Sequence, residues 1–132
     1  MSKTIKLIIN GQSYSKSNSR VFSYRNGKPL LFKNKKVLDY VDNARYQLKP
    51  QLGTHRVFLG PIRLKADIYY STKLSDLDIS LIQDILQEEI DKQYNVVLFK
   101  GVYKNDRQII ELILRKFHDK ENPRAEIEVT EL

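Results

Sequence analysis

Two aspartates separated by one residue, Asp76 and Asp78, are the strongest candidates for chemistry in this sequence. They lie in KLSDLDISLIQDIL, residues 73–86, just before apolar residues at helical spacing. Two carboxylates about 4 Å apart repel each other by about 4 kcal/mol at an effective dielectric constant of about 20. Either a helix N-terminus or a bound cation must offset this repulsion, and the two solutions predict different roles for the pair.

The helix solution requires no ligand. Ser75 and Asp78 have the spacing of a capping box, and acidic side chains in a first helical turn interact favourably with the helix dipole. Each aspartate would then stabilise the helix by about 1 kcal/mol and bind nothing. The cation solution predicts a hard divalent ion such as Mg²⁺, which is held by carboxylates, waters and phosphate oxygens.

A third carboxylate, Asp106, lies in VYKNDRQII just before a predicted strand. If that strand is a neighbour of the strand over residues 62–70, then Asp76, Asp78 and Asp106 converge at one edge of the sheet. Asn-Asp is also a common turn pair, so the local sequence leaves a purely structural role for Asp106 open.

The elements that position these residues are predicted from apolar periodicity and turn residues. Asn26-Gly27 between two short apolar runs indicates a hairpin, and Pro50 with Gly53 is expected to end the first helix. The predicted fold of residues 1–132 is a single α+β domain, in which a small mixed sheet of about four strands packs with two main helices. The expected strands are 4–9, 62–70, 108–116 and 125–130, the hairpin strands are 21–24 and 29–32, and the expected helices are 34–49 and about 76–90.

Composition excludes several classes of protein. The 132 residues are 41% hydrophobic and 30% charged, as in an ordinary globular domain, and no apolar run approaches the ~20 residues of a membrane span. The absence of cysteine excludes disulfides and thiolate metal sites and fits a reducing cytoplasm. His55 and His118 are far apart, so a zinc site is not expected.

The net charge of +7 favours an anionic partner, and nucleic acid is the commonest one for a small basic domain. Basic residues gather in the first third of the chain, interleaved with aromatic residues, a mixture that suits phosphate contacts and base stacking. Alternatively, the aromatic residues form the hairpin core and the basic residues its solvated face. The basic residues are Lys16, Arg20, Arg25, Lys28, Lys33, Lys35 and Lys36, and the aromatic ones are Tyr14, Phe22, Tyr24 and Phe32.

DLD before an apolar helix, followed by GVYKNDRQI, resembles the RusA-type Holliday-junction resolvases, which are crossover junction endodeoxyribonucleases. SKSNSR, YVDNAR, the strand from Pro61 to Tyr70 and RAEIEVTE resemble further elements of that family in the same order. The resemblance implies an Mg²⁺-dependent endonuclease, with Mn²⁺ as a substitute, that resolves four-way DNA junctions in recombination and repair by paired symmetric nicks. It also implies a homodimer in the cytoplasm of a bacterial or phage-infected cell, with no membrane and no small-molecule cofactor.

The same resemblance implies roles for individual residues. Asp76, Asp78 and Asp106 fall on the family's catalytic, metal-binding carboxylates, and Asp84 or Glu88 is a further acidic candidate. The family's helix lysine has no counterpart, because an ungapped count reaches Ile82. Its charge is instead expected from Lys104, with Lys73 and Lys100 as weaker candidates. The residues expected to contact DNA are Lys16, Asn18, Arg20, Lys33, Lys35, Lys36 and Lys73.

The missing helix lysine leaves two other functions open. One is a catalytically weak or inactive branched-DNA-binding protein of the same fold, and the other is a basic adaptor that binds protein and uses its aspartates only as caps. For a dimer, the apolar first strand over residues 4–9 is a candidate shared edge, because an unpaired strand invites pairing with another chain.

Overall fold

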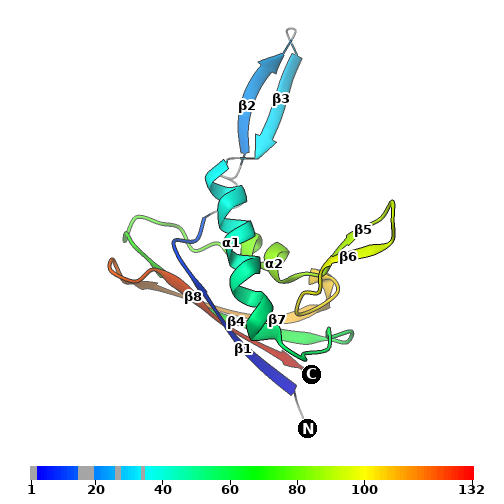
Figure 1. Ribbon diagram of the computed structural model, residues 1–132. Helices are drawn as coiled ribbons and strands as arrows, with labels where there is room; N and C mark the ends of the chain where they lie inside the picture. The colour runs from blue at the N-terminus through cyan, green and yellow to red at the C-terminus, as the bar shows by residue number, and fades with distance from the viewer. Residues whose placement is uncertain (1–2, 15–19, 26–27, 34) are drawn as a thin grey trace.

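A computed structural model describes residues 3–14, 20–25, 28–33 and 35–132. Two helices cover one face of a four-stranded sheet with the strand order β1–β8–β4–β7 (Figure 1). β4 pairs antiparallel with β8 and parallel with β7, so the sheet is mixed and the predicted α+β fold is confirmed. The elements are β1 (Lys3–Asn10), α1 (Lys35–Leu52), β4 (Ile62–Tyr70), α2 (Ser80–Leu86), β7 (Ile109–His118) and β8 (Arg124–Glu131).

Alternation of side chains along β4 fixes which face of the sheet is buried. Every second residue from Ile62 to Tyr70 lies in the core, and the residues between them lie on the other face. The apolar stripes of both helices are buried with them, at the spacing that the sequence predicts. These helical residues are Val37, Tyr40, Ala44, Leu48 and Leu52 of α1 and Leu81, Ile82, Ile85 and Leu86 of α2.

The first helix is longer than predicted. α1 continues past Pro50 to Leu52, because a proline in the last turn removes only one backbone hydrogen bond. Gly53 follows it with a φ of +49°, a conformation that glycine adopts without a steric penalty.

The second helix is shorter than predicted at both ends. α2 covers only Ser80–Leu86, and the residues after it form a hairpin of β5 (Glu89–Asp91) and β6 (Val96–Phe99) that the sequence analysis missed. A tertiary contact explains the early end, because the Glu88 N–H donates to the carbonyl of Tyr103 at 2.9 Å instead of continuing the helix.

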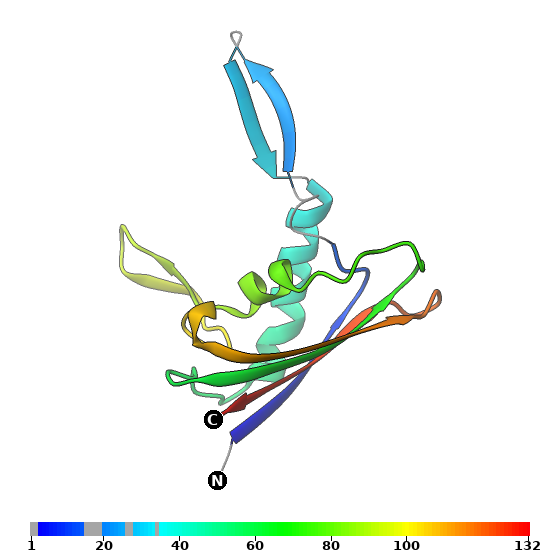
Figure 2. The ribbon, with the colours of Figure 1, turned by 180° about the vertical axis from the view of Figure 1, so that it is seen from behind.

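The hairpin predicted around Asn26-Gly27 is present as β2 (Arg20–Arg25) and β3 (Lys28–Lys33), with Arg25 paired to Lys28. Figure 2 shows this ribbon beyond the N-terminal end of α1, apart from the four-stranded sheet.

Gly101 should be irreplaceable, because its φ is +75° and an added Cβ would lie 2.5 Å from the backbone nitrogen of Glu88. We expect Gly101→Ala to lower the free energy of unfolding by about 3 kcal/mol, since neighbouring backbone would have to shift. Urea unfolding measures this loss. Gly60→Ala is the matched control, because a Cβ at Gly60 meets open space and its φ is not positive. Equal losses in the two variants would contradict the explanation.

Candidate active site

The aspartate pair lies on the loop that connects β4 to α2. Asp76 is exposed and Asp78 is half-buried. Asp78 Oδ1 accepts a hydrogen bond from the Ser80 N–H at 2.8 Å, and the Asp78 N–H donates to the Tyr70 hydroxyl at 3.4 Å. The predicted capping box of Ser75 and Asp78 does not form, because α2 begins only at Ser80. Asp78 therefore supports the start of α2, whereas Asp76 faces solvent.

The Tyr70 hydroxyl lies close to this loop, and the charges of both carboxylates affect its pKa. Burial raises the pKa of Tyr70, and the nearby charges of Asp78 and Asp76 raise it further. Asp76 and Tyr70 also line a pocket of about 330 Å³ whose other walls are mostly hydroxyl and amide side chains. The two aspartates therefore act on one small polar region of the surface.

Lys116, which the sequence did not indicate as a candidate, also brings a positive charge to this loop. Lys116 Nζ lies 5.9 Å from the centroid of the Tyr70 ring and donates to the backbone carbonyl of Lys73 at 3.2 Å. Lys116 is level with Ile68 in the parallel pairing of β7 with β4. Its position thus depends on a strand pairing that the local sequence does not reveal.

Asp106 lies near Asp84 at the other end of α2. The buried Tyr103 hydroxyl donates to the carbonyl of Gln83 at 2.6 Å, and burial raises the pKa of Tyr103 well above its usual value. The charges of Asp106 and Asp84 raise that pKa further, so both carboxylates are close to this hydroxyl. The Asp106 N–H also donates to Gln87 Oε1 at 3.0 Å, just past the C-terminus of α2.

The predicted ligands are therefore not gathered into one cluster. β4 and β7 are neighbours, which is the condition that the convergence of the three carboxylates required, but they run parallel. The pair Asp76 and Asp78 follows the C-terminal end of β4, whereas Asp106 precedes the N-terminal end of β7, and α2 spans ~10 Å between them. Within the described part of the chain, no group of three or more His, Asp or Glu side chains could hold a metal ion.

The turn at Asp106 is built by its neighbours. The Asn105 side chain accepts from the Arg107 N–H at 2.9 Å, and Gln108 Oε1 accepts from the Asn105 N–H at 2.9 Å. These two bonds form a capping box for the short 3₁₀ helix Asp106–Gln108. No hydrogen bond to the Asp106 carboxylate is found among the described residues, so the cap of this turn leaves the carboxylate available to other groups.

The predicted cations are spread over several parts of the structure. Lys104 is exposed near Asp106, Lys73 is exposed on the aspartate loop, and Lys100 Nζ donates to the carbonyl of Gly53 at 3.0 Å. Glu88 lies after α2 and lines a pocket with Lys104.

The residues expected to contact DNA lie around the N-terminus of α1 where they are described. Lys35 and Lys36 are exposed in the first turn of that helix. The backbones of Arg20 and Lys33 pair at the end of the β2–β3 ribbon nearest to it. Lys16 and Asn18 lie outside the described residues.

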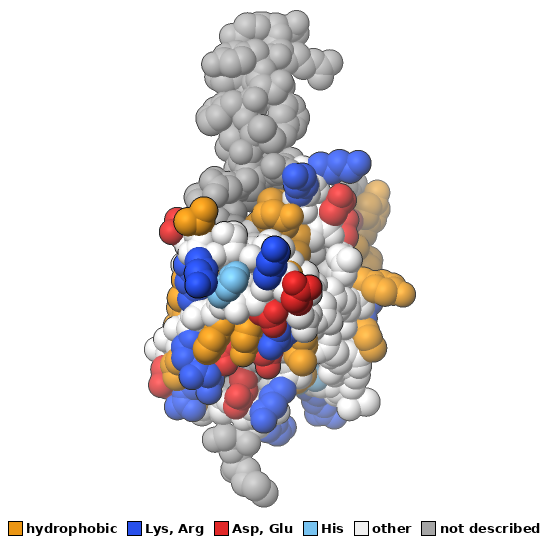
Figure 3. Space-filling view, turned by 90° about the vertical axis from the view of Figure 1, so that its left-hand side faces the viewer, with side chains coloured by type: hydrophobic (Ala, Val, Ile, Leu, Met, Phe, Trp, Pro, Cys, Tyr) orange, Lys and Arg blue, Asp and Glu red, His pale blue; other side chains and the backbone are white. Residues whose placement is uncertain are grey.

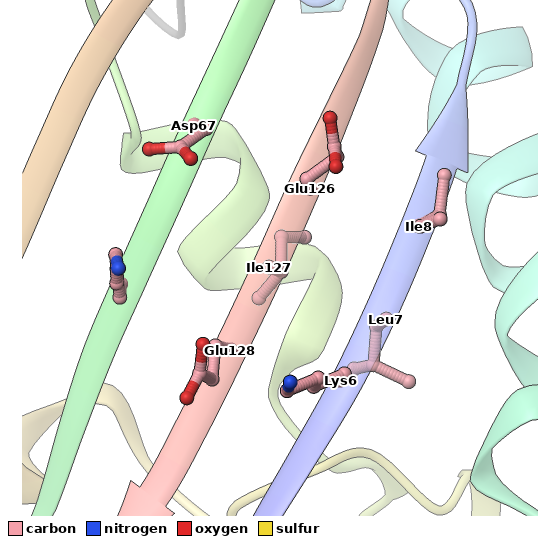
Figure 4. A pocket seen from close by; sticks show the side chains of 8 residues that line it. Lys6, Leu7, Ile8, Asp67, Glu126, Ile127 and Glu128 are labelled. Carbon is pink, nitrogen blue, oxygen red and sulfur yellow. The ribbon is translucent and has the colours of Figure 1, made fainter.

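The sheet face opposite the helices carries both signs of charge. Figure 4 shows Lys6, Asp67, Glu126 and Glu128 on β1, β4 and β8, with the helices behind the sheet. Arg115 pairs with Asp67 at 2.8 Å and lowers the pKa of that carboxyl. In Figure 3, basic and acidic side chains are likewise interspersed on the visible face. Neither view shows a continuous basic surface.

Comparison with known proteins gives one match that covers most of the chain. A family model described as endodeoxyribonuclease RusA matches residues 10–130, a range that includes every candidate residue named above for metal or DNA. No curated protein matches the sequence. None of the helices in the described residues is long and apolar enough to cross a membrane.

Proposed function

Because this chain belongs to the RusA endodeoxyribonuclease family, we propose that it resolves four-way DNA junctions by paired symmetric nicks during recombination and repair. The family match over residues 10–130 carries the proposal, since it includes the aspartate pair and Asp106. The net charge of +7 supports a nucleic-acid partner.

We assign a divalent ion, Mg²⁺ or in its place Mn²⁺, to Asp76 and Asp78. Two neighbouring carboxylates fit such an ion, because Mg²⁺ in phosphoryl-transfer sites is often held by one or two carboxylates, waters and substrate phosphates. When bound, the ion would neutralise phosphate charge and lower the pKa of the attacking water. The Ser80 N–H holds the Asp78 carboxylate, and the exposed Asp76 is accessible to a phosphate.

DNA phosphates must be held by cations against the negative charge of this loop. Lys73 and Lys116 bring positive charge to it, and Lys104 does so near Asp106. Lys35 and Lys36, together with Lys16, Asn18, Arg20 and Lys33, are proposed to contact the arms of the junction. Two symmetric nicks require two active sites, which a two-fold homodimer supplies.

The test is cleavage of a synthetic four-way junction, labelled on each strand in turn, with and without Mg²⁺. Symmetric nicks that depend on Mg²⁺ and are absent from a linear duplex of the same sequence would support the proposal. Tight junction binding without nicks would favour the inactive branched-DNA-binding protein. The absence of any salt-dependent junction binding would favour the protein-binding adaptor.

The first turn of α1 should contribute measurably to DNA affinity. Each phosphate contact contributes about 0.9 to the slope of log affinity against log salt, so Lys35→Gln/Lys36→Gln should reduce that slope by about 1.8. Fluorescence anisotropy at several salt concentrations measures the slope. Lys92→Gln/Lys120→Gln removes two exposed charges, one in the β5–β6 hairpin and one in the connection between β7 and β8, and is the control. Equal slopes for both double variants would exclude a specific contribution from α1.

A further inference from the structure

The two edge strands of the four-stranded sheet, β1 and β7, differ in how their outer backbone groups are satisfied. On β1, the N–H and C=O groups of Ile8 bond the side-chain amide of Gln51, and those of Asn10 bond that of Gln47. These four hydrogen bonds measure 2.7–3.0 Å. α1 thus occupies much of this edge, which argues against residues 4–9 as the shared edge suggested by the sequence.

The edge at β7 is open. This strand is ten residues long, and in the described part of the chain no hydrogen bond reaches the side of its backbone that faces away from β4. Its apolar side chains are also exposed, with 67% of Ile110, 43% of Leu112 and 38% of Ile113 accessible to solvent. A long, apolar, unpaired edge strand is a ready template for pairing with another chain.

We propose that two copies of this chain associate through β7, antiparallel about a two-fold axis at Ile113. Directly opposite residues in a sheet share a face, so the axis must pass through a residue. With the axis at Ile113, Glu111 lies opposite Arg115 of the partner subunit, and symmetry repeats this pair. Moving the axis by one residue in either direction removes both charge pairs.

Two ion pairs within each chain also favour this register. Glu111 lies 2.9 Å from Arg63 on β4, and Arg115 lies 2.8 Å from Asp67 on the same strand. In the dimer these pairs would join into a ladder of alternating sign across both sheets. On the helix side of the sheet, Leu112 would lie opposite Leu114 of the partner subunit, so apolar surface would be buried together with the backbone edge.

This geometry places both candidate sites on one face. A two-fold axis that relates antiparallel edge strands stands perpendicular to the sheet, so the helices of both copies lie on the same side. The two aspartate loops would then face a two-fold symmetric substrate together. The proposed interface involves only β7, and it does not require that the protein cleaves DNA.

Site-specific cross-linking tests the register, because the chain contains no cysteine. In Ile113→Cys the two new side chains would face each other with Cβ atoms about 4.5–5.5 Å apart, so a small shift of the paired edges would bring them within the ~3.5–4.5 Å that a disulfide spans under mild oxidation. We expect this variant to run mainly as a covalent dimer on a non-reducing gel. Ile8→Cys is the matched control on β1, where Ile8 is 44% exposed on the same face of the sheet (Figure 4), and it should remain monomeric.

Charge exchange gives a second test, with mass from sedimentation as the readout. Glu111→Arg should weaken dimerisation by at least about tenfold, because like charges would then face each other across the interface. The quadruple variant Arg63→Glu/Glu111→Arg/Asp67→Arg/Arg115→Glu should restore it, because every pair within and between the chains then keeps opposite signs opposed. Circular dichroism checks that each variant is folded. A monomeric wild-type protein, cross-linking of Ile8→Cys instead of Ile113→Cys, or no recovery in the quadruple variant would overturn the proposal. None of these readouts depends on junction cleavage, so failure of the nuclease proposal would be seen separately.

Discussion

Replacing Asp78 with asparagine should reduce Mg²⁺-dependent junction cleavage by about 10³-fold or more, because loss of the metal-binding charge removes several kcal/mol of transition-state stabilisation. The protein should remain folded, since an asparagine Oδ1 can still accept the hydrogen bond from the Ser80 N–H. Asp76→Asn should lose as much activity with even less effect on stability, because Asp76 is exposed. Single-turnover cleavage rates and thermal unfolding measure the two effects.

Asp91→Asn provides the matched control for this prediction. Asp91 Oδ1 accepts from the N–H groups of Gln93 at 2.9 Å and Tyr94 at 3.3 Å, so it makes the same kind of turn as Asp78. Asp91 lies in the β5–β6 hairpin and has no proposed role in metal binding. Its variant should cleave at the wild-type rate. If Asp78→Asn and Asp91→Asn cleave equally well, Asp78 is only a turn residue and the metal assignment is wrong.

Much of the fold could be predicted because it depends on local patterns. Strict alternation from Ile62 to Tyr70 marks β4, and Asn26-Gly27 marks the β2–β3 hairpin. The end of α2 could not be predicted, because it is set by the contact of Glu88 with Tyr103, which lies fifteen positions further along the chain. Residues such as Ile90 continue the helical pattern in sequence but lie in a strand in the structure.

The candidate site was predictable only in part, for a related reason. The sequence indicates Asp76, Asp78 and Asp106 as chemically interesting, and the three can converge only if the strands beside them are neighbours. It does not give the relative direction of those strands, and parallel pairing places Asp106 at the far end of α2. The same pairing brings Lys116 to the aspartate loop, so one unpredicted direction accounts for both differences.

Asp106 is nevertheless expected to matter for activity. We predict that Asp106→Asn lowers junction cleavage by about 10²-fold and leaves the free energy of unfolding unchanged, since only the charge is removed. Asn105→Ala should do the reverse, with a loss of about 1 kcal/mol of stability and most of the cleavage retained, because Asn105 makes the cap of the turn. Cleavage rates and urea unfolding of both variants test this dissociation.

The Mg²⁺ dependence of the Asp106→Asn variant identifies how the carboxylate acts. If Asp106 helps to hold an ion, raising the Mg²⁺ concentration should restore part of the lost rate, because mass action offsets a weaker site. If rate is lost at every Mg²⁺ concentration, the carboxylate acts on the substrate or on a proton instead. If Asp106→Asn cleaves at the wild-type rate at every Mg²⁺ concentration, the activity needs only the pair at Asp76 and Asp78. Their position at opposite ends of α2 would then be the physical reason, since the described carboxylates form no group of three that could hold one ion.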